Sequence, residues 1–112
     1  MELGVEIEPD RNGWAVVVVR GDVDVASAPR LHDDLVALIS GGSQRVVLDL
    51  DDVDFLDSFG LGVVIGALKR ARSHGGDLLI VCNRPRLLDL FVLTNLTRVF
   101  AIHPSIDEAV AA

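Results

Sequence analysis

The sequence predicts an α/β domain: a small, mixed, mostly parallel sheet with an N-terminal hairpin and four helices. Two observations carry this prediction. The chain opens with two strand-like segments joined by a tight turn, and short apolar strands then alternate with segments of helical periodicity. Strands connected through helices pair in parallel, with right-handed crossovers. With 112 residues, half of them apolar, the chain is expected to form one domain over residues 1–112.

The opening hairpin is predicted from alternation and from its turn. Apolar residues alternate with glutamates over residues 2–8, which is the period of a half-buried strand. The turn holds Asn12-Gly13, the strongest short hairpin signal. Residues 14–19 are nearly all apolar, so this second strand should be covered on both faces. Residues 21–24 then interrupt the pattern.

The remaining elements follow in the order α-β-α-β-α-β-α. Helices are predicted from near residue 27 to 40, over 58–73, from 85 to about 95 and from 105 onward, and strands over 45–50, 78–82 and 98–102. Pro29 fits the first turn of its helix, and Ser105 with Glu108 has the spacing of a capping box.

Composition narrows the classes of function. The net charge of −7 argues against a nucleic-acid surface, which is marked by basic patches. No apolar stretch is long enough to span a membrane and no signal peptide opens the chain, so a cytoplasmic protein without a membrane partner is expected. The single cysteine, Cys82, excludes an internal disulfide and sits in an apolar run, as expected for a buried hydrophobe rather than a redox residue.

Ser58 stands at the predicted N-terminus of the helix over residues 58–73. Backbone N–H groups at that point lack partners within the helix, and the helix dipole is positive there. Such a position can hold an anion, including a phosphate attached to the serine itself. The alternative is that Ser58 or Asp57 simply caps the helix, and the two interpretations are compatible.

Other catalytic signals are weak. His32, His74 and His103 are scattered, and none has metal-ligand spacing to another. A Ser-His-Asp arrangement stays open on sequence alone, but Ser58 lacks the glycine-flanked elbow of serine hydrolases. We therefore predict no enzyme, no catalytic residue, no metal and no cofactor.

The glycines after Ser58 do not complete a nucleotide-binding motif. Gly60 and Gly62, followed by Gly66, lack both the third glycine at dinucleotide-binding spacing and the lysine of a P-loop. They are expected instead to let the helix approach a strand or a partner closely.

Acidic residues form two clusters, Asp22 with Asp24 and, further along, Asp49, Asp51, Asp52, Asp54 and Asp57. Carboxylates in such groups can hold Mg²⁺ or transfer protons, but solvated loops explain most of them equally well. Both clusters should follow strands that end at the same edge of a parallel sheet, where binding sites tend to form. Asp24 and Ser58 are therefore expected to be neighbours.

These motifs together resemble STAS domains, and most closely the bacterial anti-sigma factor antagonists of the actinobacterial type. The D-S-x-G-L-G turn of that family is met by residues 57–62, in the expected strand-turn-helix context. The family's early acidic loop and [T/S]-A-P helix start are met by residues 21–24 and 27–29, and residues 75–78 and 96–100 also fit. The resemblance covers nearly the whole chain and implies a STAS fold.

The resemblance implies regulation by partner switching. The unmodified protein would bind an anti-sigma factor that is also a serine kinase of the histidine-kinase-like ATPase fold, and so free a sigma factor. That kinase would phosphorylate Ser58, and a PP2C-type phosphatase would reverse the modification. Asp24 matches a position that contributes to kinase recognition beside the phosphoserine. The motif residues Asp57, Gly60, Leu61 and Gly62 would belong to the partner-binding surface.

Phe59 departs from the family pattern, which usually has a small or hydroxylated residue after the serine. It removes a second phosphoacceptor and places an aromatic ring at the expected interface. Helical geometry turns Phe59 away from the inward face that begins at Leu61. Two alternatives stay open: a STAS subunit of a lipid-transport ATPase or stress-sensing complex without a phospho-switch, and nucleotide binding at the same edge.

Overall fold

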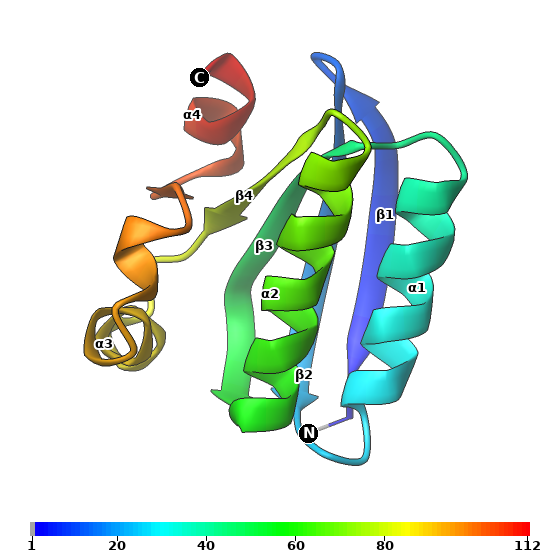
Figure 1. The fold of residues 1–112 in the computed structure, drawn as a ribbon. Coiled ribbons are helices and arrows are strands. Elements are labelled where there is room, and N and C mark those ends of the chain that lie inside the picture. The colour runs from blue at the N-terminus through cyan, green and yellow to red at the C-terminus, as the bar shows by residue number, and fades with distance from the viewer. Residues whose placement is uncertain (1) are drawn as a thin grey trace.

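The computed structural model describes residues 2–112 and contains one five-stranded sheet in the order β1-β2-β3-β4-β5 (Figure 1). Strands β1 (Gly4–Arg11) and β2 (Trp14–Val23) pair antiparallel, and β3 (Arg45–Leu56), β4 (Asp77–Val81) and β5 (Ile102–His103) extend the sheet in parallel. The predicted fold class is confirmed, with the hairpin at one side of the sheet.

The helices are distributed unevenly over the two faces of the sheet. They are α1 (Ala28–Ser40), α2 (Ser58–Ser73), α3 (Pro85–Leu93) and α4 (Ile106–Ala111), with a short 3₁₀ helix, η1 (Leu96–Arg98). Helices α1 and α2 lie side by side across one face, and α3 lies apart from this pair, on the other side of β3 in this view (Figure 1). Among residues 2–112, no helix combines the length and the apolar character needed to cross a bilayer.

Two apolar clusters hold these layers together. The larger one joins inward residues of the strands to α1, α2 and α3, and includes fully buried Leu48 and Phe91. The smaller one packs Trp14, Val16 and Val47 against Val110 of α4. Strand β2 contributes to both clusters, so the prediction that residues 14–19 are covered on both faces is confirmed.

Several local predictions are confirmed by backbone geometry. The hairpin turn has positive φ angles at Asn12 (55°) and Gly13 (87°), as the Asn-Gly signal requires. The Ser105 hydroxyl accepts a hydrogen bond from the Glu108 N–H (3.1 Å) and caps α4.

Strands β2 and β3 are longer than predicted. Residues 21–23 of the expected interruption belong to β2, and β3 continues past the predicted end at residue 50 through residues 51–56. The pairing of β2 with β3 shifts register twice, between Val18 and Arg20 and between Gly21 and Asp22. Each such irregularity inserts a residue and breaks the alternation of side chains, so a search for period 2 loses the strand.

The last strand was predicted wrongly. Residues 98–100 form no strand, and β5 holds only Ile102–His103. Asn95 adopts a left-handed backbone (φ 63°), and the Leu96 carbonyl accepts hydrogen bonds from the N–H groups of Val99 and Phe100. Phe100 is buried edge-to-face against Phe91, so its apolar character reflects packing under α3.

Candidate partner-binding site at the start of helix α2

The site lies where β2 and β3 end and α1 and α2 begin (Figure 1). Two hydrogen bonds join these connections: Asp57 N–H donates to the Val23 carbonyl (3.2 Å), and Val25 N–H donates to Asp57 Oδ2 (3.1 Å). Val25, which follows Asp24, is thus hydrogen-bonded to Asp57, which precedes Ser58. The two segments predicted to meet at this edge do meet.

Asp57, rather than Ser58, caps helix α2. Its Oδ1 atom accepts hydrogen bonds from the N–H groups of Phe59 (2.9 Å) and Gly60 (3.0 Å). Ser58 is the first residue of the helix, and its side chain is exposed. Within residues 2–112 the Ser58 hydroxyl has no hydrogen-bond partner, and it lies at a positively polarised helix end.

Asp24 holds the β2–α1 connection in shape. Its Oδ1 atom accepts hydrogen bonds from the N–H groups of Ala26 and Ser27 (3.0 Å each). The hydrogen bonds from Ser27, and secondarily that from Ala26, hold the pKa of the Asp24 carboxyl below its usual range. Ser27 does not cap α1, because its hydroxyl donates instead to the Asp22 carbonyl (2.8 Å).

Exposed apolar side chains occur at this edge on the segments next to Ser58. Phe59 is 58% exposed, as its predicted position off the inward face of α2 requires. Val25 in the β2–α1 connection is 59% exposed, and Phe55 near the end of β3 is 52% exposed. Sequence reasoning missed Val25 and Phe55, although each is a large apolar residue that directly follows an aspartate near the end of a strand.

The other motif residues divide between surface and core. Gly62 is exposed, and Leu61 is half-buried and packs against the core. Gly60 is buried, so it cannot supply the partner-binding surface predicted for it. A Cβ atom at Gly60 would lie 2.6 Å from Leu56 Cδ1 and 2.7 Å from the Val23 carbonyl oxygen. Its role is to let α2 approach the ends of β2 and β3.

Most of the second acidic cluster serves strand and loop structure. The Asp51 carboxylate accepts a hydrogen bond from Asn83 N–H (2.6 Å), and Asp54 pairs with Arg84 (2.9 Å), which fixes the β4–α3 connection. Asp49 is half-buried, and this burial raises its pKa. In the described part of the chain, no three His, Cys, Asp or Glu side chains are grouped to hold a metal ion.

Cys82 is buried at the end of β4, as predicted for a small hydrophobe. Burial raises the pKa of its thiol, which disfavours the reactive thiolate.

Comparison with known proteins identifies the family. The STAS domain family matches residues 7–109. The chain belongs to the STAS domain family. Among curated relatives, the anti-sigma-B factor antagonist of Bacillus subtilis is 35% identical over 102 residues, covering 91% of this chain and 92% of the relative. The anti-sigma-B factor antagonist of Listeria monocytogenes is 29% identical, covering 91% and 90%.

Solved structures of other proteins share the fold over nearly the whole chain. An anti-sigma factor antagonist from Mycobacterium paratuberculosis superimposes with a TM-score of 0.89 at 28% identity, covering 98% of this chain and 92% of that one. The phosphorylated form of the Bacillus cell fate determinant SpoIIAA has a TM-score of 0.74 at 17% identity, covering 96% and 97%. The second comparison bears on the fold alone.

Proposed function

We propose that this STAS domain is a non-enzymatic anti-sigma factor antagonist whose unmodified form binds an anti-sigma factor and so frees a sigma factor. The two curated relatives described above match this chain over most of their length, and both are anti-sigma-B factor antagonists. The observation that carries the proposal is the state of Ser58: an exposed hydroxyl at the N-terminus of α2, on an edge with exposed Val25, Phe55 and Phe59. Exposed aromatic residues are typical anchors of protein interfaces.

The proposed switch is phosphorylation of Ser58 by the anti-sigma factor itself, acting as a serine kinase of the histidine-kinase-like ATPase fold. The Ser58 Oγ atom attacks the γ-phosphorus of ATP, the bond from that phosphorus to the β-γ bridging oxygen breaks, and ADP and the hydroxyl proton leave. A PP2C-type phosphatase returns the serine by hydrolysis. Asp24, beside the loop bonded to Asp57, is assigned to kinase recognition.

The electrostatics of the edge support such a switch. A phosphate adds about −1.5 to −2 charges and three acceptor oxygens. Asp57 already occupies two N–H donors of the helix end and repels a second anion, while the helix dipole partly offsets that repulsion. The domain should therefore stay folded, and a partner packed on Phe59 would meet a new dianion that it must desolvate.

The direct test is phosphorylation of the serine. Incubation with the host's anti-sigma kinase and ATP is expected to add one phosphate to the wild type and none to Ser58→Ala, measured by intact-protein mass spectrometry. Ser105→Ala serves as the control, because Ser105 is occupied as the cap of α4 and should leave labelling unchanged. Undiminished labelling of Ser58→Ala would contradict the proposal.

Phe59 tests the proposed interface separately from the phosphosite. Phe59→Ala is expected to weaken binding of the anti-sigma factor by about 1–3 kcal/mol, as loss of an aromatic anchor does. Its melting temperature should change little, because the side chain is 58% exposed. The matched control is Leu93→Ala on α3, which removes an 83% exposed apolar side chain outside this edge. Equal losses for both variants, measured by titration calorimetry, would show that Phe59 has no special role.

A further inference from the structure

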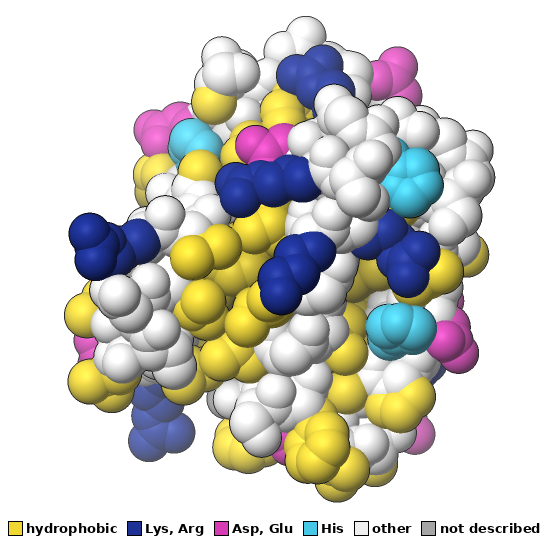
Figure 2. Space-filling model, viewed as in Figure 1, with side chains coloured by type: hydrophobic (Ala, Val, Ile, Leu, Met, Phe, Trp, Pro, Cys, Tyr) yellow, Lys and Arg dark blue, Asp and Glu magenta, His cyan; other side chains and the backbone are white. Residues whose placement is uncertain are grey.

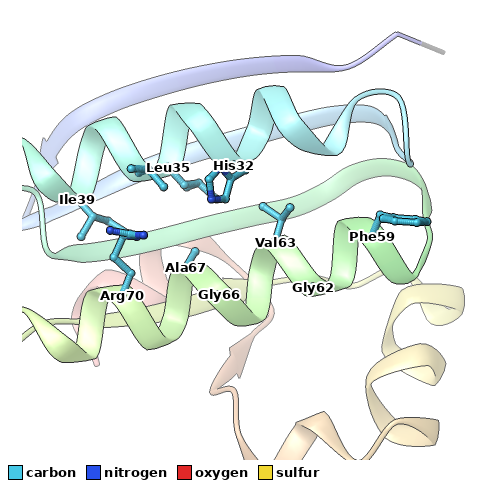
Figure 3. A pocket seen from close by; sticks show the side chains of 10 residues that line it. His32, Leu35, Ile39, Phe59, Gly62, Val63, Gly66, Ala67 and Arg70 are labelled. Atoms are coloured by element: carbon cyan, nitrogen blue, oxygen red, sulfur yellow. The ribbon is translucent and has the colours of Figure 1, made fainter.

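A groove of about 250 Å³ runs between α1 and α2. Its walls are apolar, with Leu35 and Ile39 on α1 and Val63 and Ala67 on α2 (Figure 3). Phe59 lies at the end of the groove next to Ser58, on the first turn of α2 (Figure 3). The groove therefore begins at the surface proposed above and continues along the helical face of the domain.

One wall of the groove has exposed backbone. Gly62 and Gly66 lie one helical turn apart on α2 and both line the groove. A Cβ atom built at either position meets nothing within 4 Å, so neither glycine is explained by packing within the domain. The absence of side chains at this spacing leaves room for large side chains of another helix to enter the groove beside α2.

The groove also has a charge that contrasts with the rest of the chain. Arg70 lines it, and no carboxylate is among the lining residues that the structure gives. His32 on the opposite wall lies 3.2 Å from the Asp33 carboxylate, so Arg70 is the charged group at the groove among the described residues. Helix α2 carries Lys69, Arg70 and Arg72 with no acidic residue, although the chain has a net charge of −7. Figure 2 shows Lys and Arg side chains gathered over this helical face.

Arg70 is available to a partner. Its neighbour Arg72 pairs with Asp77 (3.2 Å), whereas the Arg70 guanidinium makes no ion pair within residues 2–112. An exposed guanidinium at the end of an apolar groove favours a carboxylate as its ligand, because the guanidinium fork matches carboxylate geometry.

We infer that the α1–α2 groove receives an acidic amphipathic helix of the protein that binds at Ser58. This inference rests on the proposed function, because Phe59 belongs to both the groove and the edge around Ser58. The partner helix would place apolar side chains, spaced three and four residues apart, against the half-buried Val36 and Val63, and a carboxylate at Arg70. From Ser58 to Arg70 is twelve residues of α2, about 18 Å, which a partner segment of about 12 helical residues spans.

This arrangement gives the phosphate a second way to act. At physiological salt, electrostatic interactions between exposed charges are largely screened beyond about 8 Å. The charge of a phosphate on Ser58 would therefore act on the Phe59 end of the groove and much less on Arg70. It would repel the near end of an acidic helix while leaving the far contact intact. Loss of the Phe59 end and loss of the Arg70 end are therefore separable by mutation.

The test uses two pairs of variants and titration with the purified anti-sigma factor that binds the wild-type chain. Gly66→Leu fills the groove, and Gly66→Ala adds one methyl group in open space as its control. Arg70→Glu reverses the charge at the groove end, and Lys69→Glu makes the same change of net charge on the neighbouring exposed residue outside the groove. Gly66→Leu and Arg70→Glu are expected to weaken binding at least about tenfold, and both controls to stay within about threefold.

Hydrogen exchange of the wild-type complex provides an independent readout. Protection is expected along α1 over residues 32–39 and along α2 over 62–70, in addition to the edge around Ser58. Protection confined to that edge, or wild-type affinity in both Gly66→Leu and Arg70→Glu, would overturn the groove proposal. Self-association of the free protein that Gly66→Leu abolishes, seen by sedimentation, would overturn it in favour of a second copy of this chain.

The same titration separates this inference from the proposed function. If Ser58→Glu loses affinity while both groove variants bind normally, the groove proposal fails and the switch stands. If Ser58→Glu binds as tightly as the wild type, the proposed switch fails, and the groove variants then report on the groove alone.

Discussion

Phosphorylation of Ser58 is expected to weaken binding of the anti-sigma factor by about a hundredfold or more while the domain stays folded. A loss of a few kcal/mol follows from burying a dianion against a closely packed partner surface, and every 1.4 kcal/mol is a factor of ten in affinity. The fold should survive because Ser58 is exposed and its hydroxyl makes no hydrogen bond within the described residues. Negative charge is also tolerated at a helix N-terminus.

Charged and neutral substitutions separate charge from size. Ser58→Glu is expected to weaken binding in the same direction as the phosphate but less, since a carboxylate carries less charge. Ser58→Gln has nearly the same shape without the charge, so it should retain more affinity than Ser58→Glu. Titration calorimetry measures both affinities, and circular dichroism checks that both variants fold. Equal losses in the two variants would attribute the effect to bulk and contradict an electrostatic switch.

Gly60→Ala is expected to destabilise the domain by about 1–3 kcal/mol, the usual range for forcing atoms into a packed site. The new methyl group would lie 2.7 Å from the Val23 carbonyl oxygen, a backbone atom that also accepts a hydrogen bond from Asp57 N–H. The helix must therefore shift, and the bond between the two connections should weaken with it.

Gly62→Ala is the matched control, two residues further along the same helix. Its Cβ atom meets nothing within 4 Å, so replacing an exposed helical glycine should raise stability by about 0.5–1 kcal/mol. Urea unfolding of both variants checks the opposite signs. Equal stability changes in Gly60→Ala and Gly62→Ala would show that the close approach at Gly60 is not rigid.

The fold could be predicted where the residue types of a short segment themselves require its backbone geometry. Asn12-Gly13 requires positive φ angles, and it forms the hairpin turn. The strand–Asp57-Ser58–helix order likewise places an exposed serine at the start of α2. Prediction failed where packing altered the period, as in β3, where register shifts bring Leu50, Val53 and Leu56 inward at spacing three.

The sequence by itself determined the fold class, the position of Ser58 at a helix start and the exposure of Phe59, because each depends on residues close together in the chain. Only the tertiary structure decided that Asp57 is the cap and bonds Val25 across the edge, and that Gly60 is buried. It alone also placed α1 against α2 with Phe59 and Arg70 at the two ends of one groove. These features depend on how elements that are distant in the sequence pack against one another. The side-chain periodicity within one segment carries no information about that packing.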